Sequence, residues 1–240
     1  SCGAQILAFN NDNSALTLTA DGEEASLTPV AGDVTNQNTS VQYATIQAGI
    51  DAASAGDVLI LAATTFYPTS TITVDKPLTI TGAGSGSTTI TTTSAGYGMS
   101  ISADNVSLSG FTLDGSGTFG VKASGVSNFS LNDVEATNGG NSAIDLNGVN
   151  GATLTNISAS NTALGYGLAI ASSSDITING ITTSSNTYGA VGIFPAQTQY
   201  QDAGLEAPSN FVIGGTVSLN SGAGSITVQN GALNSGGTWV

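Results

Sequence analysis

The stretch from Asn105 to Ile193 repeats one pattern four times. The recurring block reads NVSLSGF from Asn105, NFSLNDV from Asn128, GATLTNI from Gly151 and DITINGI from Asp175. The block starts are separated by 23, 23 and 24 residues. A fixed step of this length is typical of a repeat protein, in which each unit buries its apolar face by stacking on its neighbours.

A second block keeps pace with the first. It reads GMSI from Gly98, GVKA from Gly120, AIDL from Ala143, GLAI from Gly167 and AVGI from Ala190. Both blocks alternate apolar with small polar residues, as expected of a strand with one buried face. The two blocks and their Gly-, Asn- and Ser-rich turns predict a parallel β-helix, all strand and turn, with coils stacked roughly 4.8 Å apart.

An Asp or Asn residue follows each block at a similar distance. Asn tolerates the left-handed backbone conformation and can hydrogen-bond the equivalent residue of the next coil. Because these residues recur at a similar distance from each block start, a structural ladder is favoured over a set of unrelated loop asparagines. The predicted ladder consists of Asp114, Asn138, Asn161, Asn186 and Asn220.

The N-terminal residues 1–40 do not follow the repeat. They are expected to form a strand appendage, with strands at 4–10, 15–20 and 25–30 joined by turns. The acidic run from Asp21 to Glu24 could hold calcium, but it lacks the ligand spacing of a known calcium loop, so a solvated turn is the default interpretation. No other metal or cofactor site is predicted.

Residues 41–240 form the expected β-helix. Near its start, 43–54 places Ile46 and Ile50 on one helical face. This spacing predicts a short helix that covers the open end of the apolar core, where a sheet edge would otherwise be exposed. Extra residues at 195–209 interrupt the repeat and predict an insertion loop, where a solenoid commonly varies for function.

Residues 43–61, YATIQAGIDAASAGDVLIL, resemble the opening of pectin-lyase-like right-handed parallel β-helix proteins. In that superfamily a cap helix, a Gly-Asp turn and a first strand precede the coils. The phrase GFTLDG at 110–115 is similar to the superfamily's generic coil repeat. The resemblance covers about residues 41–230 and implies a right-handed β-helix. It implies little about activity, because the superfamily contains lyases, hydrolases, esterases, adhesins and tailspikes.

Charge and composition exclude several functions. The 240-residue chain has 16 acidic residues, two basic residues, no His and a formal net charge of −14. It therefore lacks the cations needed to neutralise nucleic acid or to bind an anionic membrane surface. No stretch is long enough to cross a membrane. The low content of charged residues, at 8%, and the scarcity of sites for trypsin-like proteases predict an extracellular or cell-surface protein that has lost a signal peptide.

The resemblance also implies which residues catalysis would need. The superfamily's lyases, hydrolases and esterases rely on basic residues, whereas this chain offers only Lys76 and Lys122, in different coils and without matching motifs. Carboxylates alone can perform acid–base chemistry, but each one here also reads as a turn residue or an outward strand residue. We therefore predict that the chain is not an enzyme. The carboxylates considered were Asp114, Asp133, Asp145 and Asp175.

The main functional prediction is a non-catalytic structural or surface protein that self-associates through its termini and its solenoid ends. Strand-like and apolar residues near both ends favour strand addition or coil stacking with another copy. A single cysteine cannot form an internal disulfide, so it is expected to be free, bonded to another chain or lipid-modified. The candidate assembly residues are Cys2, Ile6, Phe9, Leu16, Leu18, Trp239 and Val240.

Three alternatives compete with self-association. Outward hydroxyls from Thr79 to Thr177 would form an ice-binding face, although Ser130 and Asn132 interrupt it. Aromatic residues recur at similar distances before the second block. They would form a glycan-binding platform, or would pack on one another. The last alternative is a polysaccharide-active enzyme that uses carboxylates. The aromatic residues concerned are Tyr97, Tyr166 and Tyr188.

Overall fold

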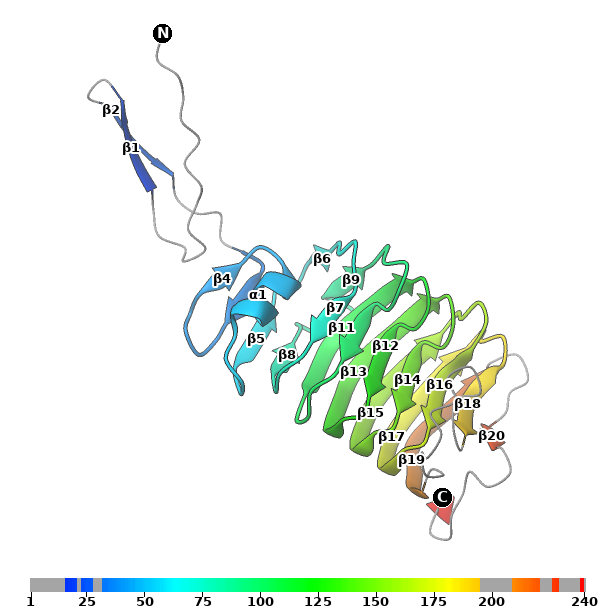
Figure 1. Cartoon of the computed structure of the whole chain (residues 1–240). Coiled ribbons are helices and arrows are strands. Elements are labelled where there is room, and N and C mark those ends of the chain that lie inside the picture. Colours follow the sequence, from blue (N-terminus) through cyan, green and yellow to red (C-terminus); the bar gives the residue numbers. More distant parts are fainter. Residues whose placement is uncertain are drawn as a thin grey trace.

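A computed structural model describes residues 32–194 in full and, outside this range, the backbone of several strands (Figure 1). The outer strands are β1 (Leu16–Ala20), β2 (Glu23–Leu27), β19 (Ser209–Asn220), β20 (Ile226–Val228) and β21 (Thr238–Trp239). The fully described elements are β3 (Val34–Asn36), β4 (Gln42–Tyr43), α1 (Ile46–Ala52), β5 (Val58–Leu61), β6 (Thr65–Phe66), β7 (Ile72–Val74), β8 (Thr79–Thr81), β9 (Thr89–Thr91), β10 (Met99–Ile101), β11 (Ser107–Ser116), β12 (Val121–Ser124), β13 (Ser127–Gly139), β14 (Ile144–Asn147), β15 (Asn150–Ser160), β16 (Tyr166–Ala171), β17 (Ser174–Ser184) and β18 (Gly189–Phe194).

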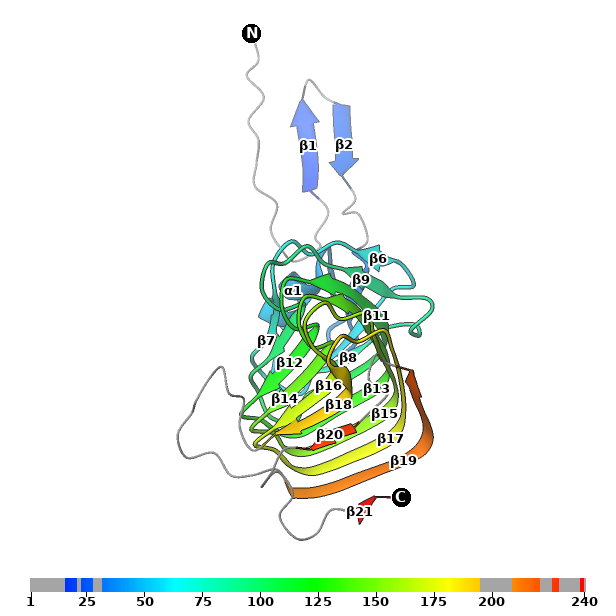
Figure 2. The ribbon, with the colours of Figure 1, turned by 90° about the vertical axis from the view of Figure 1, so that its right-hand side faces the viewer.

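Two parallel sheets form the walls of the solenoid. Sheet 1 has the strand order β20-β18-β16-β14-β12-β10-β7, and sheet 2 follows β21-β19-β17-β15-β13-β11-β8-β5 before it ends on the antiparallel strands β3 and β4. The chain alternates between the two walls, and each pass adds one strand to each sheet. Viewed along the solenoid, short strands line one side and long bent strands wrap around the others (Figure 2). The predicted right-handed parallel β-helix, with a helix at its start, is confirmed.

Three columns of left-handed residues lie within the long strands or next to their ends. The first column is Asn105, Asn128, Gly151 and Asp175, the second is Gly110, Asp133, Asn156 and Gly180, and the third is Gly115, Asn138, Asn161 and Ser185. Gly, Asn and Asp adopt this conformation at the lowest cost, which explains why they recur at these positions. The block identified from sequence is therefore one strand segment between two corners of the coil.

The predicted Asx ladder maps onto these corners as follows. Asn138 and Asn161 occupy the third column, and Asn138 Nδ2 donates to Asp114 Oδ1 at 2.7 Å from the neighbouring coil. Asp114 itself lies one residue before that column. Asn186 lies one residue after it, is fully buried, and donates to the Ala159 carbonyl at 2.9 Å. The Asn220 side chain lies outside the described residues.

The core is a set of vertical rows of apolar residues. One row in sheet 2 runs through Leu59, Ile80, Leu108, Leu131, Leu154 and Ile178, and each member is completely or almost completely buried. Sheet 1 contributes a facing row of Ile72, Met99, Val121, Ile144, Leu168 and Val191. Parallel in-register pairing places like positions on top of one another, so one continuous core runs along the solenoid.

The N-terminal end of this core is closed by α1 and β3. Thr45 caps the helix by accepting a hydrogen bond from the Ala48 N–H at 3.1 Å, and Ile46 and Ile50 are buried. Val34 of β3 is fully buried and pairs with Leu61 of β5. The strand β3 precedes the expected boundary at residue 40 and is paired within sheet 2. The cap helix lies inside the expected range 43–54.

The N-terminal appendage contains one antiparallel hairpin, formed by β1 and β2. These two strands overlap the expected strands at 15–20 and 25–30. The hairpin pairs with no other described strand. The expected strand at 4–10 and the insertion loop at 195–209 lie largely or wholly outside the described residues.

One of the two lysines closes the C-terminal end of the helix. Lys76 Nζ donates to the carbonyls of Ile50 at 3.0 Å, Asp51 at 3.2 Å and Ala53 at 3.2 Å. A cation is favourable next to the last carbonyls of a helix, and here it adds to the bond that the Ile50 carbonyl accepts from the Ala53 N–H at 3.2 Å. We expect Lys76→Met to lower the free energy of unfolding by about 1.5–3 kcal/mol in urea titrations. The neighbouring exposed change Asp75→Asn is the control, and equal stability of both variants would contradict this role.

Asp57 links the cap to the first coil and makes stability depend on pH. Asn36 Nδ2 donates to its Oδ2 at 2.7 Å and the Ser54 N–H at 2.9 Å, and these bonds lower the pKa of Asp57 below its ordinary value. A carboxyl with a lowered folded-state pKa stabilises the protein above its unfolded pKa of about 4 and loses this contribution as the pH falls further. We expect Asp57→Asn to reduce the loss of stability on acidification, measured by urea unfolding at several pH values. An equal loss of unfolding free energy in the two proteins as the pH is lowered would contradict the assignment.

Candidate functional site

The outward side of sheet 1 brings the second lysine beside a carboxylate. The outward positions of successive strands form the row Ser100, Lys122, Asp145, Ala169 and Gly192. Lys122 and Asp145 are direct neighbours in β12 and β14 because the strands pair in register. From the sequence, Lys122 was noted only as lying in a different coil from Lys76 and without a matching motif, and its contact with Asp145 was not predicted.

Lys122 and Asp145 form a buried ion pair. Lys122 Nζ lies 2.5 Å from Asp145 Oδ2, and the two side chains are 11% and 0% exposed, respectively. Removing two charges from water is costly, and a buried pair adds little net stability compared with apolar side chains of similar size. The solenoid core lies on the other side of the sheet, so packing alone does not require a charged pair at this place. This makes the pair a candidate functional feature.

Aromatic rings surround this pair. Lys122 Nζ lies 4.5 Å from the ring centroid of Phe119 and 5.7 Å from that of Tyr97, and the two rings are 5.9 Å apart. Phe119 is almost buried, whereas Tyr97 is partly exposed. These distances are within the range of cation–π attraction, so the rings hold the ammonium group in place as well as covering it.

A second aromatic group lies further along the same face. The Tyr166 ring is 5.3 Å from Phe194 and 6.0 Å from Tyr188. Gly192 has no side chain beneath these rings, and a Cβ added there would lie 2.5 Å from Phe194 Cζ. Tyr188 is 53% exposed, so this group presents an aromatic surface to solvent.

The two aromatic groups lie on one line. Tyr97, Phe119 and Tyr166 each lie two residues before the matched positions Met99, Val121 and Leu168, and Tyr188 lies one residue outside this column. The phase noticed in the sequence is therefore real for Tyr97 and Tyr166. We call the surface formed by Tyr97, Phe119, Lys122, Asp145, Tyr166, Tyr188 and Phe194 the aromatic face.

An unused polar atom lies beside the ion pair. Asn147 follows Asp145 by two residues in β14, so both lie on the outward side of the strand. The Asn147 Oδ1 atom is buried and has no hydrogen-bond partner among the described residues. Buried polar atoms without partners are uncommon in native proteins, so Asn147 is a second feature on this side of sheet 1 that packing alone does not explain.

The other carboxylates considered for catalysis lie on the sheet 2 side and apart from one another. Asp114 accepts from Asn138, and Asp133 accepts from Ser85 N–H and Ser85 Oγ at 3.2 and 2.9 Å. Asp175 lies at an exposed corner of the coil. None of the three lies in the outward row of sheet 1 with Asp145.

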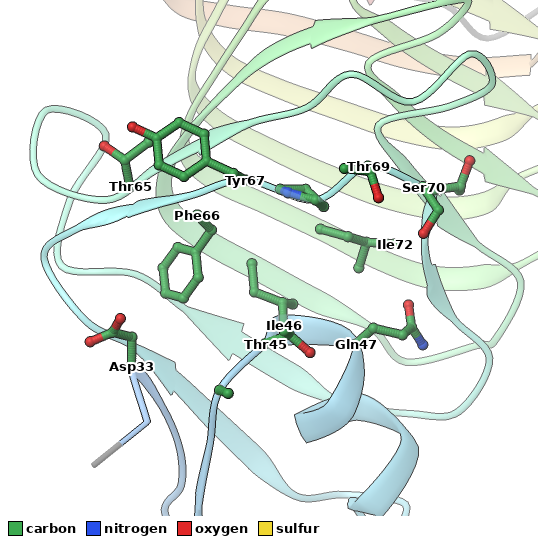
Figure 3. Close-up of a pocket in the computed structure, with 13 residues that line it drawn as sticks. Asp33, Thr45, Ile46, Gln47, Thr65, Phe66, Tyr67, Thr69, Ser70 and Ile72 are labelled. Atoms are coloured by element: carbon green, nitrogen blue, oxygen red, sulfur yellow. The ribbon is translucent and has the colours of Figure 1, made fainter. Parts of the chain in front are cut away.

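A separate pocket of about 410 Å³ lies at the N-terminal end of the β-helix. It opens between the start of α1 and the segment from β6 to β7, with Asp33 at one side and Tyr67 at the other (Figure 3). Phe66, Ile46 and Ile72 form its buried floor. From the sequence, Ile46 was assigned only to the buried face of the cap helix, and no pocket was predicted here.

The hydroxyl stripe on sheet 2 is arranged in register as expected. Its two rows are Thr79, Ser107, Ser130, Thr153 and Thr177, and Thr81, Ser109, Asn132, Thr155 and Asn179. Ice binding through these rows stays a prediction, and thermal hysteresis of the purified protein would test it.

The candidate assembly residues fall outside the side chains that the structure describes. Leu16 and Leu18 lie in β1 and Trp239 in β21, of which only the backbone is described, and Cys2, Ile6, Phe9 and Val240 lie outside the described residues. The same holds for the acidic turn from Asp21 to Glu24 considered for calcium.

Within the described part of the chain, no group of three or more His, Cys, Asp or Glu side chains is placed to hold a metal ion. No helix among these residues has the length and apolarity to cross a membrane.

The fold is shared with proteins of known structure. A protein of Geobacillus virus E2, ORF18, matches with a TM-score of 0.61 and 15% identity over 84% of this chain. This chain has the pectin-lyase-like β-helix fold. The match covers 48% of the viral protein, so the chain spans about half of its length. No family model and no curated protein matches the sequence.

Enzymes with the same fold give weaker matches. An alginate lyase from Paenibacillus sp. strain FPU-7 has a TM-score of 0.45 and 15% identity, covering 81% of this chain and 94% of the lyase. A pectin methylesterase bound to a hexasaccharide has a TM-score of 0.43 and 13% identity, covering 73% of this chain and 75% of the esterase. These likenesses concern the fold alone. They correct the expectation that the chain is not an enzyme, because the same fold carries polysaccharide-active enzymes and composition does not exclude catalysis.

Proposed function

We propose that the chain binds a glycan along the aromatic face, outside the cell or at its surface. The observation that carries this proposal is the combination of a buried Lys122–Asp145 pair with aromatic rings on the outward side of sheet 1. Flat aromatic rings can pack against the apolar faces of sugar rings, while a few polar groups fix the orientation of the ligand. This favours one of the alternatives that the sequence left open.

The length of the aromatic face suits an extended ligand. From the coil of Met99 to that of Val191 there are four steps of the solenoid, a span of about 19 Å at roughly 4.8 Å per step. Tyr97 lies near one end of this span and Tyr188 near the other. An oligosaccharide lying along the solenoid axis would contact both aromatic groups and pass over the ion pair.

Binding should depend on the exposed ring. We expect Tyr188→Ala to weaken the affinity for the responding glycan at least tenfold in calorimetric titrations, because it removes the most exposed ring of the face. The matched control is Leu164→Ala, an equally exposed apolar residue in the adjacent coil, whose loop is bonded to the Tyr188 N–H through Gly165. The Leu164 variant should bind like the parent. Equal weakening in both variants, or in neither, would contradict the proposal.

The same ion pair supports a second candidate function, a polysaccharide-active enzyme. Asp145 and Lys122 are a carboxylate and an ammonium in hydrogen-bond contact, which is a set that can move a proton. Incubating the protein with the bound glycan and measuring new reducing ends separates binding from turnover. Turnover that disappears in Asp145→Asn would favour the enzyme, and unchanged glycan would favour binding alone.

Self-association remains a further proposal. The hairpin of β1 and β2 pairs with no other described strand, and an isolated two-stranded hairpin is only marginally stable in water. Pairing with another copy would stabilise it. Electron microscopy and light scattering at high protein concentration would show filaments or oligomers, and a monomer throughout would contradict this proposal.

A further inference from the structure

The N-terminal pocket carries an inference that is independent of the aromatic face. We propose that it binds a sugar residue with a free, protonated amine. The pocket volume of about 410 Å³ falls within the range of small-molecule sites. Its walls combine one carboxylate, one exposed aromatic ring and several hydroxyls, and no basic residue lines it.

Asp33 supplies the charge. Its side chain is exposed at the side of the pocket and takes part in no hydrogen bond or ion pair with the other described residues (Figure 3). A carboxylate with neither a basic neighbour nor a structural partner attracts a cation, and the net charge of −14 reinforces that field. A single carboxylate with hydroxyls falls short of the several carboxylate and carbonyl oxygens that calcium requires, which favours an organic cation over a metal ion.

Tyr67 supplies the second contact. Tyr67 is 74% exposed, which is unusual for a large aromatic residue, and its ring lies on the other side of Phe66 from Asp33 (Figure 3). A ring in this position can pack against a sugar and attract an ammonium group at the same time. Phe66, Ile46 and Ile72 provide an apolar floor for the rest of the ligand.

The remaining polar groups separate into occupied and available ones. The Gln47 amide donates to Asp51 and to the Thr73 carbonyl and accepts from the Thr73 N–H, and the Thr71 hydroxyl donates to the Tyr97 carbonyl. These two side chains hold the wall in place. The exposed hydroxyls of Thr65, Thr69 and Ser70 make no hydrogen bond to other described residues and can bond sugar hydroxyls.

The test compares two probes that differ only at the nitrogen. Calorimetry would titrate the protein with a glucosamine oligosaccharide and with its N-acetylated counterpart, at a pH at which the free amine is protonated. We expect the free amine to bind at least tenfold more tightly, and increasing salt to weaken this binding. Equal affinity for the two probes, or binding of neither, would overturn the proposal.

Variants locate the binding. Asp33→Asn should remove the preference for the amine, and Tyr67→Ala should weaken binding of both probes. Asp75→Asn, an exposed carboxylate outside the pocket lining, should leave the preference unchanged and controls for net charge. Tyr188→Ala should also leave it unchanged, so failure of the aromatic face and failure of this pocket are distinguishable. An unchanged preference in Asp33→Asn would overturn the proposal.

Discussion

Replacing Lys122 with Met should lower the free energy of unfolding by about 3–5 kcal/mol, because it leaves the Asp145 carboxylate buried without its cation. Urea unfolding at neutral pH measures this loss. Asp145→Leu should be less damaging, because the remaining ammonium group still faces the rings of Phe119 and Tyr97.

The double variant Lys122→Met/Asp145→Leu separates stability from function. Apolar side chains of similar volume commonly replace a buried ion pair at no cost, or with a gain of about 1–4 kcal/mol. We therefore expect the double variant to be as stable as the parent or more stable, and to lose glycan binding at the aromatic face. A double variant that loses stability but retains binding would mean that the pair maintains the fold and serves no ligand.

Leu131→Ala should cost about 2–5 kcal/mol of unfolding free energy. Leu131 is fully buried and stacks between Leu108 and Leu154, so its truncation leaves a cavity in the middle of the core. The adjacent residue Ser130 lies on the outward side of the same strand, and Ser130→Ala should change stability by less than about 0.5 kcal/mol. Both values come from denaturant titrations.

A core of stacked coils requires this difference between the buried Leu131 and the outward Ser130. Local repacking around Leu131 reduces the cost only partly, because each coil contacts its neighbours on both sides. A loss below about 1 kcal/mol for Leu131→Ala, or equal losses for the two variants, would contradict the continuous core.

Much of the fold was predictable because the repeat encodes it. The steps of 23 and 24 residues fixed the coil length, and the period-two alternation fixed which residues face the core. What the pattern did not reveal was that each long strand passes through a corner. Gly110, Asp133, Asn156 and Gly180 bend the chain without ending the pairing, because a single left-handed residue redirects a strand while its neighbours keep their register.

The ion pair shows a signal that was present in the sequence but not used. Lys122 is the third residue of GVKA and Asp145 is the third residue of AIDL. Because these are copies of the same block, the two residues lie at the same position of adjacent coils. In a parallel in-register solenoid, that position implies contact.

The pocket and the strand β3 could not be predicted from the repeat. Both depend on tertiary packing of non-repeating segments, namely the residues from β6 to β7 against α1, and β3 against β5. A strand as short as Val34–Asn36 has no period to detect. Periodicity therefore predicts the body of this solenoid and its cap helix, but not how the non-repeating segments pack around them.

The most direct test of the central claim is a crystal structure of the protein with the oligosaccharide that gives the strongest response in a glycan-binding screen. The structure should show sugar rings on the outward side of sheet 1, against Tyr188 and Tyr166 and within hydrogen-bond distance of Lys122, Asp145 or Asn147. A ligand seated elsewhere with the aromatic face empty, or a screen in which no glycan binds, would contradict the account.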